Sequence, residues 1–179
     1  ASALEDGKVQ YSCMPNDAGG IVDDMLVYRL TSDRFMLVVN ASNREKDWNW
    51  IQEQVTLHAW DATVRDESDR YALLAVQGPN AQDMVRRLGP ARADGLPWSE
   101  LAYYTFTLGK LMGHEVILSA TGYTGSGGLE IYMPVEAAES VWDALLAEGA
   151  APCGLGARDT LRMEMGYCLY GNDLNDNTS

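Results

Sequence analysis

A glycine-rich loop that runs into an apolar strand constrains the fold of this chain more than any other segment. Glycines stand at positions 122, 125, 127 and 128, and glycine permits backbone conformations and close approaches that other residues exclude. The strand that follows, 129–133, is apolar except for Glu130, its second residue. An acid within an otherwise apolar strand is typical of a residue that is selected for a functional site and not for the stability of the strand. The pattern predicts a site where the backbone approaches a flat ligand closely.

The segment 154–164 predicts a helix whose charges oppose its stability. Arg158 falls in the first turn, where the helix macrodipole disfavours a cation, and Arg162 places a like charge four residues further on the same face. Asp159 and Glu164 offset part of this cost. Such a conflict indicates that a site, and not helix stability, has selected the residues. The alternative for Arg158 is a salt bridge to a neighbouring carboxylate.

Length and charge exclude several classes of protein. The chain has 179 residues, 46% of them hydrophobic, which suits one domain or two small ones. It contains no apolar run near the roughly 20 residues that span a bilayer, and no signal or transit peptide is visible. The net charge of −13 repels nucleic-acid phosphates and anionic membranes. We therefore expect neither nucleic acid nor membrane as a partner.

The cysteines and histidines give no metal-binding pattern. The three cysteines are odd in number and form no Cys-x-x-Cys pair, which predicts neither a disulfide framework nor a zinc site. We expect them to be packing residues in a reducing compartment. His58 and His114 show no ligand spacing, so no metal site is expected.

The order of the expected elements predicts an α+β fold with mainly antiparallel sheets and packed helices. In the first part, strands 21–30 and 35–39 form a hairpin around a turn at 31–34. Ser42 and Glu45 predict a capping box at the start of a helix. The segment 56–64 is expected to be extended.

A polar connection at 66–70 is a possible boundary within the region 1–179. The expected elements after it are strand 71–77, a helix opened by Gly78 and Pro79, a loop at 91–97, strands 103–108 and 115–120, and strand 129–133. A third helix follows, with Ala138, Val141, Trp142 and Leu145 on its buried face.

Two adjacent acids open the first strand of the hairpin. Successive side chains of a strand point to opposite faces, so we expect only one of Asp23 and Asp24 to enter a pocket. Asp24 shares its face with uncharged residues, whereas Asp23 shares its face with Arg29. Asp24 is therefore the better candidate for a partly desolvated carboxylate that accepts a proton. The alternative is that both acids cap the turn after Gly20.

Eight segments, spread over essentially the whole chain and in the same order, resemble the aminomethyltransferase (T-protein) family of the glycine cleavage system. These segments are 4–8, 19–24, 38–41, 45–47, 77–81, 122–125, 156–162 and 169–173. The resemblance implies a tetrahydrofolate-binding region built from ferredoxin-like α+β units. It also implies a C-terminal β-barrel domain in complete members. We expect this chain to lack that domain and roughly the first fifty residues of the family, and so to be truncated at both ends.

The resemblance assigns roles to five residues. Asp24 matches the catalytic aspartate beside N5 of the folate, and Asn40 matches an asparagine at the pocket edge. Tyr123 matches a tyrosine that lines the pocket, Glu130 the glutamate that pairs with the pterin, and Arg158 a folate-contacting arginine. The chemistry agrees for Glu130, because a pterin presents adjacent N–H donors that a carboxylate accepts as a pair.

The implied reaction moves the methylene of an aminomethyl group from a lipoyl arm to tetrahydrofolate, with release of ammonia. The implied partner is the lipoylated carrier H-protein, and the implied location is the cytoplasm of a bacterium or the mitochondrion of a eukaryote.

Two alternatives to this function remain. One is a related folate domain that acts on sarcosine, dimethylglycine or dimethylsulfoniopropionate. The other is a folate-binding accessory protein for iron–sulfur assembly, whose Lys-x-Cys-Tyr-x-Gly-Gln-Glu motif is poorly matched by residues 166–173.

Overall fold

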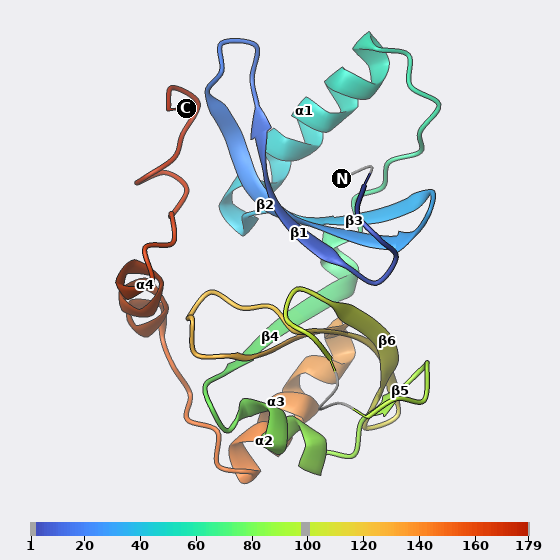
Figure 1. The fold of residues 1–179 in the computed structure, drawn as a ribbon, viewed down its shortest axis with the longest axis vertical. Coiled ribbons are helices and arrows are strands. Elements are labelled where there is room, and N and C mark those ends of the chain that lie inside the picture. Colours follow the sequence, from blue (N-terminus) through green and yellow to red (C-terminus); the bar gives the residue numbers. More distant parts are fainter. Residues whose placement is uncertain (1–2, 98–100, 179) are drawn as a thin grey trace. The chain divides into compact units, whose positions relative to one another are not determined.

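The computed structural model describes residues 3–97 and 101–178 and divides into two compact units. Unit 1 consists of Ala1–Glu67 and Cys168–Ser179, and unit 2 of Ser68–Tyr167. Each unit combines an antiparallel sheet with helices (Figure 1). The predicted α+β class is therefore confirmed.

Unit 1 is built on a three-stranded antiparallel sheet of order β1-β2-β3, against which α1 packs. The bounds are β1 Val9–Pro15, β2 Ile21–Thr31, β3 Arg34–Val38, a 3-10 turn η1 at Ala41–Asn43, and α1 Arg44–Leu57. The predicted hairpin is confirmed as β2 and β3. Val22, Val27 and Tyr28 of β2 are buried and form the centre of this unit.

Both predicted ends of the first helix were wrong. Ser42 lies in η1, and Asn43 occupies the N-cap of α1 but its side chain makes no capping hydrogen bond to the helix, so no capping box forms. At the other end the helix continues through Thr56, whose hydroxyl donates to the carbonyl of Gln52 at 2.9 Å. This bond satisfies the side chain within the helix. Residues 58–64, which were expected to be extended, belong to no strand.

The C-terminal segment 168–178 returns to unit 1 and binds the β1–β2 turn. The amide of Ile21 donates to the carbonyl of Asn175 at 3.0 Å, and Asn16 Nδ2 donates to the carbonyl of Asp176 at 2.9 Å. A Cβ on Gly20 would lie 1.8 Å from the same Asp176 oxygen. Glycine is required at position 20 because the backbone of the C-terminal segment fills the space a side chain would need.

Unit 2 contains a five-stranded antiparallel sheet of order β4-β8-β7-β6-β5. After the 3-10 turn η2 Ser68–Arg70, the strands are β4 Tyr71–Gln77, β5 Ala91–Arg92, β6 Phe106–Leu111, β7 His114–Ser119 and β8 Gly128–Pro134. The helices are α2 Ala81–Arg87, α3 Ala138–Ala147, which follows η4 Val135–Ala137, and α4 Leu155–Glu164. Helix α2 packs on β4 and β8, and α3 packs on β4 (Figure 1).

The core of unit 2 lies between this sheet and helices α2 and α3. Val85, Leu129, Ile131, Met133 and Val141 are among its fully buried side chains. No helix in residues 3–97 and 101–178 has the length and hydropathy to cross a membrane.

Three local predictions for unit 2 need correction. Trp142 is 40% exposed and lies beside the buried face of α3, which Val141 and Leu145 form. The expected loop at 91–97 begins with the short strand β5. The strand expected at 103–108 begins at Phe106 and ends at Leu111.

Candidate functional site

Glu130 is a buried acid in the middle of the unit 2 sheet. It lies in β8 opposite Ser119 of β7, and only 7% of its surface is exposed. The hydroxyl of Thr121 donates to Glu130 Oε2 at 2.5 Å and forms a second hydrogen bond with Ser119 Oγ at 2.8 Å. Burial raises the pKa of Glu130, while the Thr121 hydrogen bond and the positive charge of Arg158 act to lower that pKa. Glu130 is thus an acceptor shielded from water.

An arginine and two tyrosines stack near this acid. Arg158, from α4, places its guanidinium carbon 4.5 Å from the centre of the Tyr123 ring. Tyr123 in turn stacks on Tyr167, with ring centres 5.7 Å apart and an angle of 26° between the planes. Among residues 3–97 and 101–178 Arg158 forms no salt bridge, and its guanidinium makes a cation–π contact with Tyr123.

Arg162 has a structural explanation. It is buried, its Nε donates to Asp159 Oδ1 at 2.8 Å, and its Nη1 donates to the carbonyl of Tyr167 at 3.1 Å. The contact with Asp159, three residues earlier, offsets the like charge of Arg158. Arg162 therefore fixes the chain that leaves α4 and carries Tyr167.

A cavity of about 300 Å³ opens beside Thr121, which donates a hydrogen bond to Glu130, although Glu130 itself is not among the residues that line the cavity. This volume is at the lower end of the range for small-molecule sites. Its lining combines aromatic rings, glycine backbone and one amide side chain. The lining residues are Gln77, Tyr103, Thr121, Gly122, Gly125, Gly127, Gly128, Met165 and Tyr167.

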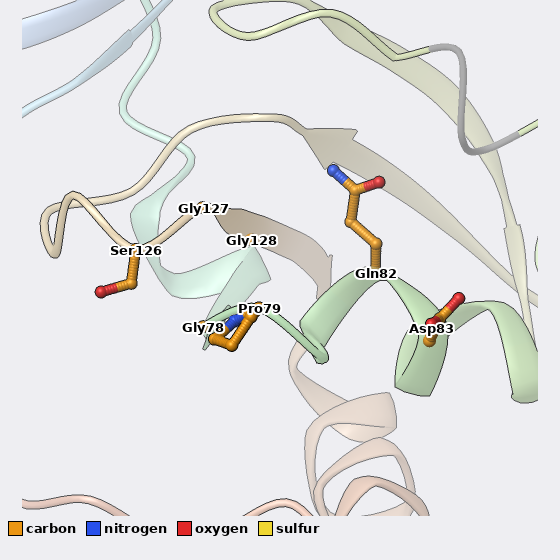
Figure 2. Close-up of a pocket in the computed structure, with 7 residues that line it drawn as sticks. All are labelled: Gly78, Pro79, Gln82, Asp83, Ser126, Gly127 and Gly128. Atoms are coloured by element: carbon orange, nitrogen blue, oxygen red, sulfur yellow. The ribbon is translucent and has the colours of Figure 1, made fainter.

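A second cavity, of about 240 Å³, shares Gly127 and Gly128 with the first. Figure 2 shows it between the end of the glycine-rich loop, the turn at Gly78 and Pro79, and the side chains of Gln82 and Asp83 on α2. Asp83 pairs with Arg86 at 2.8 Å. None of the described residues that line this second cavity is aromatic, so the cavity beside Thr121 is the better site for a planar ligand.

The glycines of the loop are explained first by the packing of the chain itself. A Cβ at Gly122 would lie 2.0 Å from Gln77 Oε1, one at Gly125 would lie 2.4 Å from the Met165 side chain, and one at Gly128 would lie 2.3 Å from the carbonyl of Val76. Residues of this chain occupy the space that we expected a ligand to use. The loop still lines the cavity with its backbone.

Gln77, Tyr103, Thr121 and Tyr167 belong to the site but were not predicted. Gln77 Nε2 donates to the carbonyls of Thr121 and Leu129 at 3.2 and 3.1 Å, which ties both sides of the loop to β4. Burial, followed by a hydrogen bond with Tyr167, raises the pKa of Tyr103 to about 12. The sequence did contain a signal for Thr121. A buried Glu130 requires a hydrogen-bond donor, and Thr121 lies just beyond the end of the adjacent strand β7.

Asp24, in unit 1, is held by two donors. Tyr11 OH donates to Asp24 Oδ2 at 2.8 Å, and Asn40 Nδ2 donates to Asp24 Oδ1 at 2.8 Å. Burial, then the hydrogen bond with Asp24, raises the pKa of Tyr11, so this hydroxyl remains a donor. The two contacts fix both oxygens of the carboxylate.

The more buried acid of the pair is Asp23, contrary to our expectation. Its exposure is 0%, and it accepts hydrogen bonds from Asn40 N at 3.0 Å, Asn40 Nδ2 at 2.8 Å and Asn43 Nδ2 at 2.7 Å. One amide, that of Asn40, therefore reaches both acids although they are neighbours on a strand. Neither acid caps the preceding turn, whose amides at 18 and 20 bind Asn16 Oδ1.

The five predicted site residues thus form two groups. Asp24 and Asn40 meet in unit 1, while Tyr123, Glu130 and Arg158 lie together in unit 2.

In residues 3–97 and 101–178 no group of three or more acids, histidines and cysteines is placed to hold a metal ion. Cys13, Cys153 and Cys168 are exposed, so the prediction that they are packing residues was wrong.

A buried acid, a cation–π stack and a small cavity on an α+β scaffold are features typical of domains that bind a small planar molecule. The chain belongs to the GCVT N-terminal domain family, which matches residues 1–179. It is 51% identical to an aminomethyltransferase of Phocaeicola vulgatus and 50% identical to one of Flavobacterium psychrophilum; these alignments cover 99% and 100% of this chain and 48% and 49% of the relatives.

A solved structure agrees with this family. The glycine cleavage system aminomethyltransferase T from Bartonella henselae superposes with a TM-score of 0.84 at 32% identity, over 99% of this chain and 46% of that protein. The chain spans about half the length of the relatives it matches.

Proposed function

We propose that this chain is the tetrahydrofolate-binding part of a glycine cleavage system aminomethyltransferase. The complete protein moves the methylene of an S-aminomethyl-dihydrolipoyl carrier protein to tetrahydrofolate and releases ammonia. The names of relatives at about 50% identity support the class of enzyme. The observation that supports the folate assignment is the buried carboxylate of Glu130, hydrogen-bonded to Thr121, which lines a cavity together with Tyr103 and Tyr167.

The residues around the cavity fit a pterin ring. A pterin offers adjacent N–H donors, and a carboxylate such as Glu130 accepts two of them in parallel. Tyr103 and Tyr167 offer flat surfaces for the bicyclic ring, and a cavity of about 300 Å³ suits one such ring. Arg158, held over Tyr123, supplies a positive charge for the acidic tail of a folate.

Asp24 is proposed as the catalytic residue. It receives the proton of the folate N5 as that nitrogen attacks the methylene carbon and passes this proton to the amino group, which leaves as ammonia. The carbon–sulfur bond then breaks when N10 of the folate attacks the same carbon, and the N10 proton leaves with the dihydrolipoyl sulfur as the free thiol. Two hydrogen bonds, from Tyr11 and Asn40, hold the carboxylate in one orientation. A base with a fixed orientation contributes about 10²–10⁴-fold to such a step.

The lipoylated carrier H-protein is the proposed partner, and its lipoyl arm delivers the aminomethyl group. The relatives at about 50% identity come from bacteria, so a bacterial cytoplasm is the proposed location. The same relatives favour aminomethyl transfer over the related folate-dependent demethylases, because they carry the name aminomethyltransferase.

Calorimetric titration of this chain with 5-methyltetrahydrofolate tests the proposal. We expect saturable binding by the wild type and none by Glu130→Ala, because the substitution removes the acceptor of the pterin donors. Ser126→Ala serves as the matched control in the same loop and should bind like the wild type. Binding that survives Glu130→Ala unchanged would refute the assignment of this carboxylate. If the wild type does not bind, titration of the full-length protein decides whether further residues complete the pocket.

A further inference from the structure

Asp47 is a buried acid for which the proposed reaction has no use. It lies in the first turn of α1 and is 1% exposed. Neither of its carboxyl oxygens has a hydrogen-bond donor among the residues that the structure describes. A buried ionised carboxylate without a donor is strongly unfavourable. The side chain needs either a donor or a proton of its own.

The neighbouring acid, Asp23, is in the opposite situation. It is fully buried but accepts three hydrogen bonds, two from Asn40 and one from Asn43. A carboxylate that accepts several amide hydrogen bonds is stabilised in its charged form. After these three contacts the carboxylate of Asp23 still has a lone pair available, since two carboxylate oxygens offer about four acceptor positions.

We propose that Asp47 is a neutral carboxylic acid that donates a hydrogen bond to Asp23, and that this pair, through Asn40, positions Asp24. The arrangement gives each group what it lacks. Asp47 obtains an acceptor for its proton, and Asp23 obtains one more donor. The statement about Asp24 rests on the proposed function, whereas the state of the Asp23–Asp47 pair does not.

The surroundings of Asp47 favour its protonated form. Burial raises the pKa of Asp47 to about 8, and both the hydrogen bond with Asp23 and the negative charge of Asp23 act in the same direction. Asp176, on the C-terminal segment, raises the pKa further, and Lys46 lowers it. Lys46 is occupied elsewhere: its Nζ donates to Tyr170 OH at 2.6 Å and lies 3.4 Å from Asp176 Oδ2.

Asn40 links the pair to the proposed catalytic acid. Its Nδ2 lies 2.8 Å from Asp23 Oδ1 and 2.8 Å from Asp24 Oδ1, so one amide group serves both carboxylates. Loss of the Asp47 proton would place a second negative charge against Asp23. The Asn40 amide would then bind Asp23 more strongly and Asp24 less. Asp47 acts on Asp24 only through these contacts and is a positioning residue.

Carboxyl ¹³C NMR of the wild-type chain tests the state of Asp47 directly. Asp47→Asn identifies the resonance and keeps a donor toward Asp23. We expect the Asp47 signal to titrate near pH 8 and the Asn40 side-chain amide to shift with the same midpoint. In Asp47→Asn the Asn40 amide should show no transition there. Titration of Asp47 near the ordinary pKa of about 4 would overturn the proposal. So would an Asn40 side-chain amide whose chemical shift does not change when Asp47 titrates.

The pH dependence of stability gives a second readout. An acid whose pKa is raised by folding stabilises the folded state at low pH, and this contribution is lost as pH rises toward the folded pKa. Between about pH 4 and pH 8 the ratio of folded to unfolded wild type should therefore fall, relative to Asp47→Asn, by roughly tenfold per pH unit. Parallel curves for the two proteins would contradict the proposal.

Asp47→Ala, which leaves Asp23 without the donor, should be less stable than Asp47→Asn at every pH. If Asp47→Asn does not fold, the titration of the wild type alone decides. These measurements contain neither folate nor carrier protein. Their failure would leave the proposed aminomethyl transfer standing, and failure of the folate titration would leave the Asp23–Asp47 pair standing.

Discussion

The hydroxyl of Thr121 donates a hydrogen bond to the buried carboxylate of Glu130 at 2.5 Å. This contact allows an acid to occupy the middle of an otherwise apolar strand, because a hydrogen bond to the charged form offsets part of the cost of burial. Thr121 also lines the cavity, so its hydroxyl connects the buried carboxylate of Glu130 to the wall of the cavity.

Thr121→Val should shift the acid limb of folate binding to higher pH. The hydrogen bond from Thr121 lowers the pKa of Glu130 against the effect of burial, so its removal raises that pKa. Folate binding requires the carboxylate and is lost as pH falls through the pKa. Calorimetric titrations over a range of pH measure the midpoint of this loss. Ser119→Ala, which leaves the contact with Glu130 in place, is the control, and identical midpoints for all three proteins would contradict the prediction.

Tyr123→Leu should weaken folate binding by about 2–5-fold, whereas Tyr123→Phe should bind nearly as tightly as the wild type. The leucine removes the ring that holds the Arg158 guanidinium, a contact with a typical free energy of about 0.5–1 kcal/mol at an exposed site. Phenylalanine keeps the ring face. Dissociation constants from calorimetry distinguish the two. Equal weakening by both substitutions would show that the cation–π contact does not support binding.

Asp24→Asn should leave much of the folate binding intact and lower turnover of the complete protein by about 10²-fold or more. Asparagine keeps the shape of the side chain but accepts no proton from N5. Tyr11→Phe should produce a smaller loss of turnover, because it removes one of the two donors that orient Asp24. Binding by calorimetry and turnover by ammonia release are measured on the same preparations. Equal loss of binding and turnover in Asp24→Asn would refute this division of roles.

Asn40→Ala should lower the free energy of unfolding by about 1–3 kcal/mol, the typical cost of an unsatisfied buried polar group. The substitution removes the Nδ2 donor of both Asp23 and Asp24. Asn43→Ala removes a single contact with Asp23 and should cost less. Urea denaturation monitored by circular dichroism compares the variants. A larger loss in Asn43→Ala would show that the bridge between the two acids is not the main stabilising feature.

Gly20→Ala should release the C-terminal segment from the β1–β2 turn. The new Cβ would lie 1.8 Å from the carbonyl oxygen of Asp176, a position that backbone cannot share. We expect faster proteolytic cleavage within 168–178 and a loss of about 1–3 kcal/mol in the free energy of unfolding. Gly156→Ala, where a Cβ meets open space, is the control, and equal cleavage of the two variants would contradict the expectation.

The sequence predicted the elements whose pattern depends on local residues. Strands 21–30, 71–77 and 129–133 carry long apolar or alternating runs, and each is present within one residue of its predicted ends. The ends of α1 could not be predicted in this way. The 3-10 turn before the helix and the continuation of the helix to Leu57 are choices among local geometries of similar energy.

For the candidate site, an acid that breaks an apolar strand singled out Glu130, which the structure shows to be buried; its role in binding stays a prediction. Its surroundings were not predictable, because the register of β7 against β8 brings Ser119 opposite Glu130 and the chain beyond α4 brings Tyr167 to Tyr123. The alternation of strand side chains misled us about Asp23. Asn40, which follows the adjacent strand, supplies donors that make burial of Asp23 favourable.

The return of segment 168–178 to unit 1 sets the order in which the chain can fold during synthesis. The whole of unit 2 lies between the two segments of unit 1. A ribosome releases every residue of unit 2 before it reaches Asn175, the acceptor for the amide of Ile21. Since domains fold as units while the chain grows, unit 2 can reach its native state first. Residues 1–67 must therefore remain partly folded until translation of residues 168–179 completes unit 1.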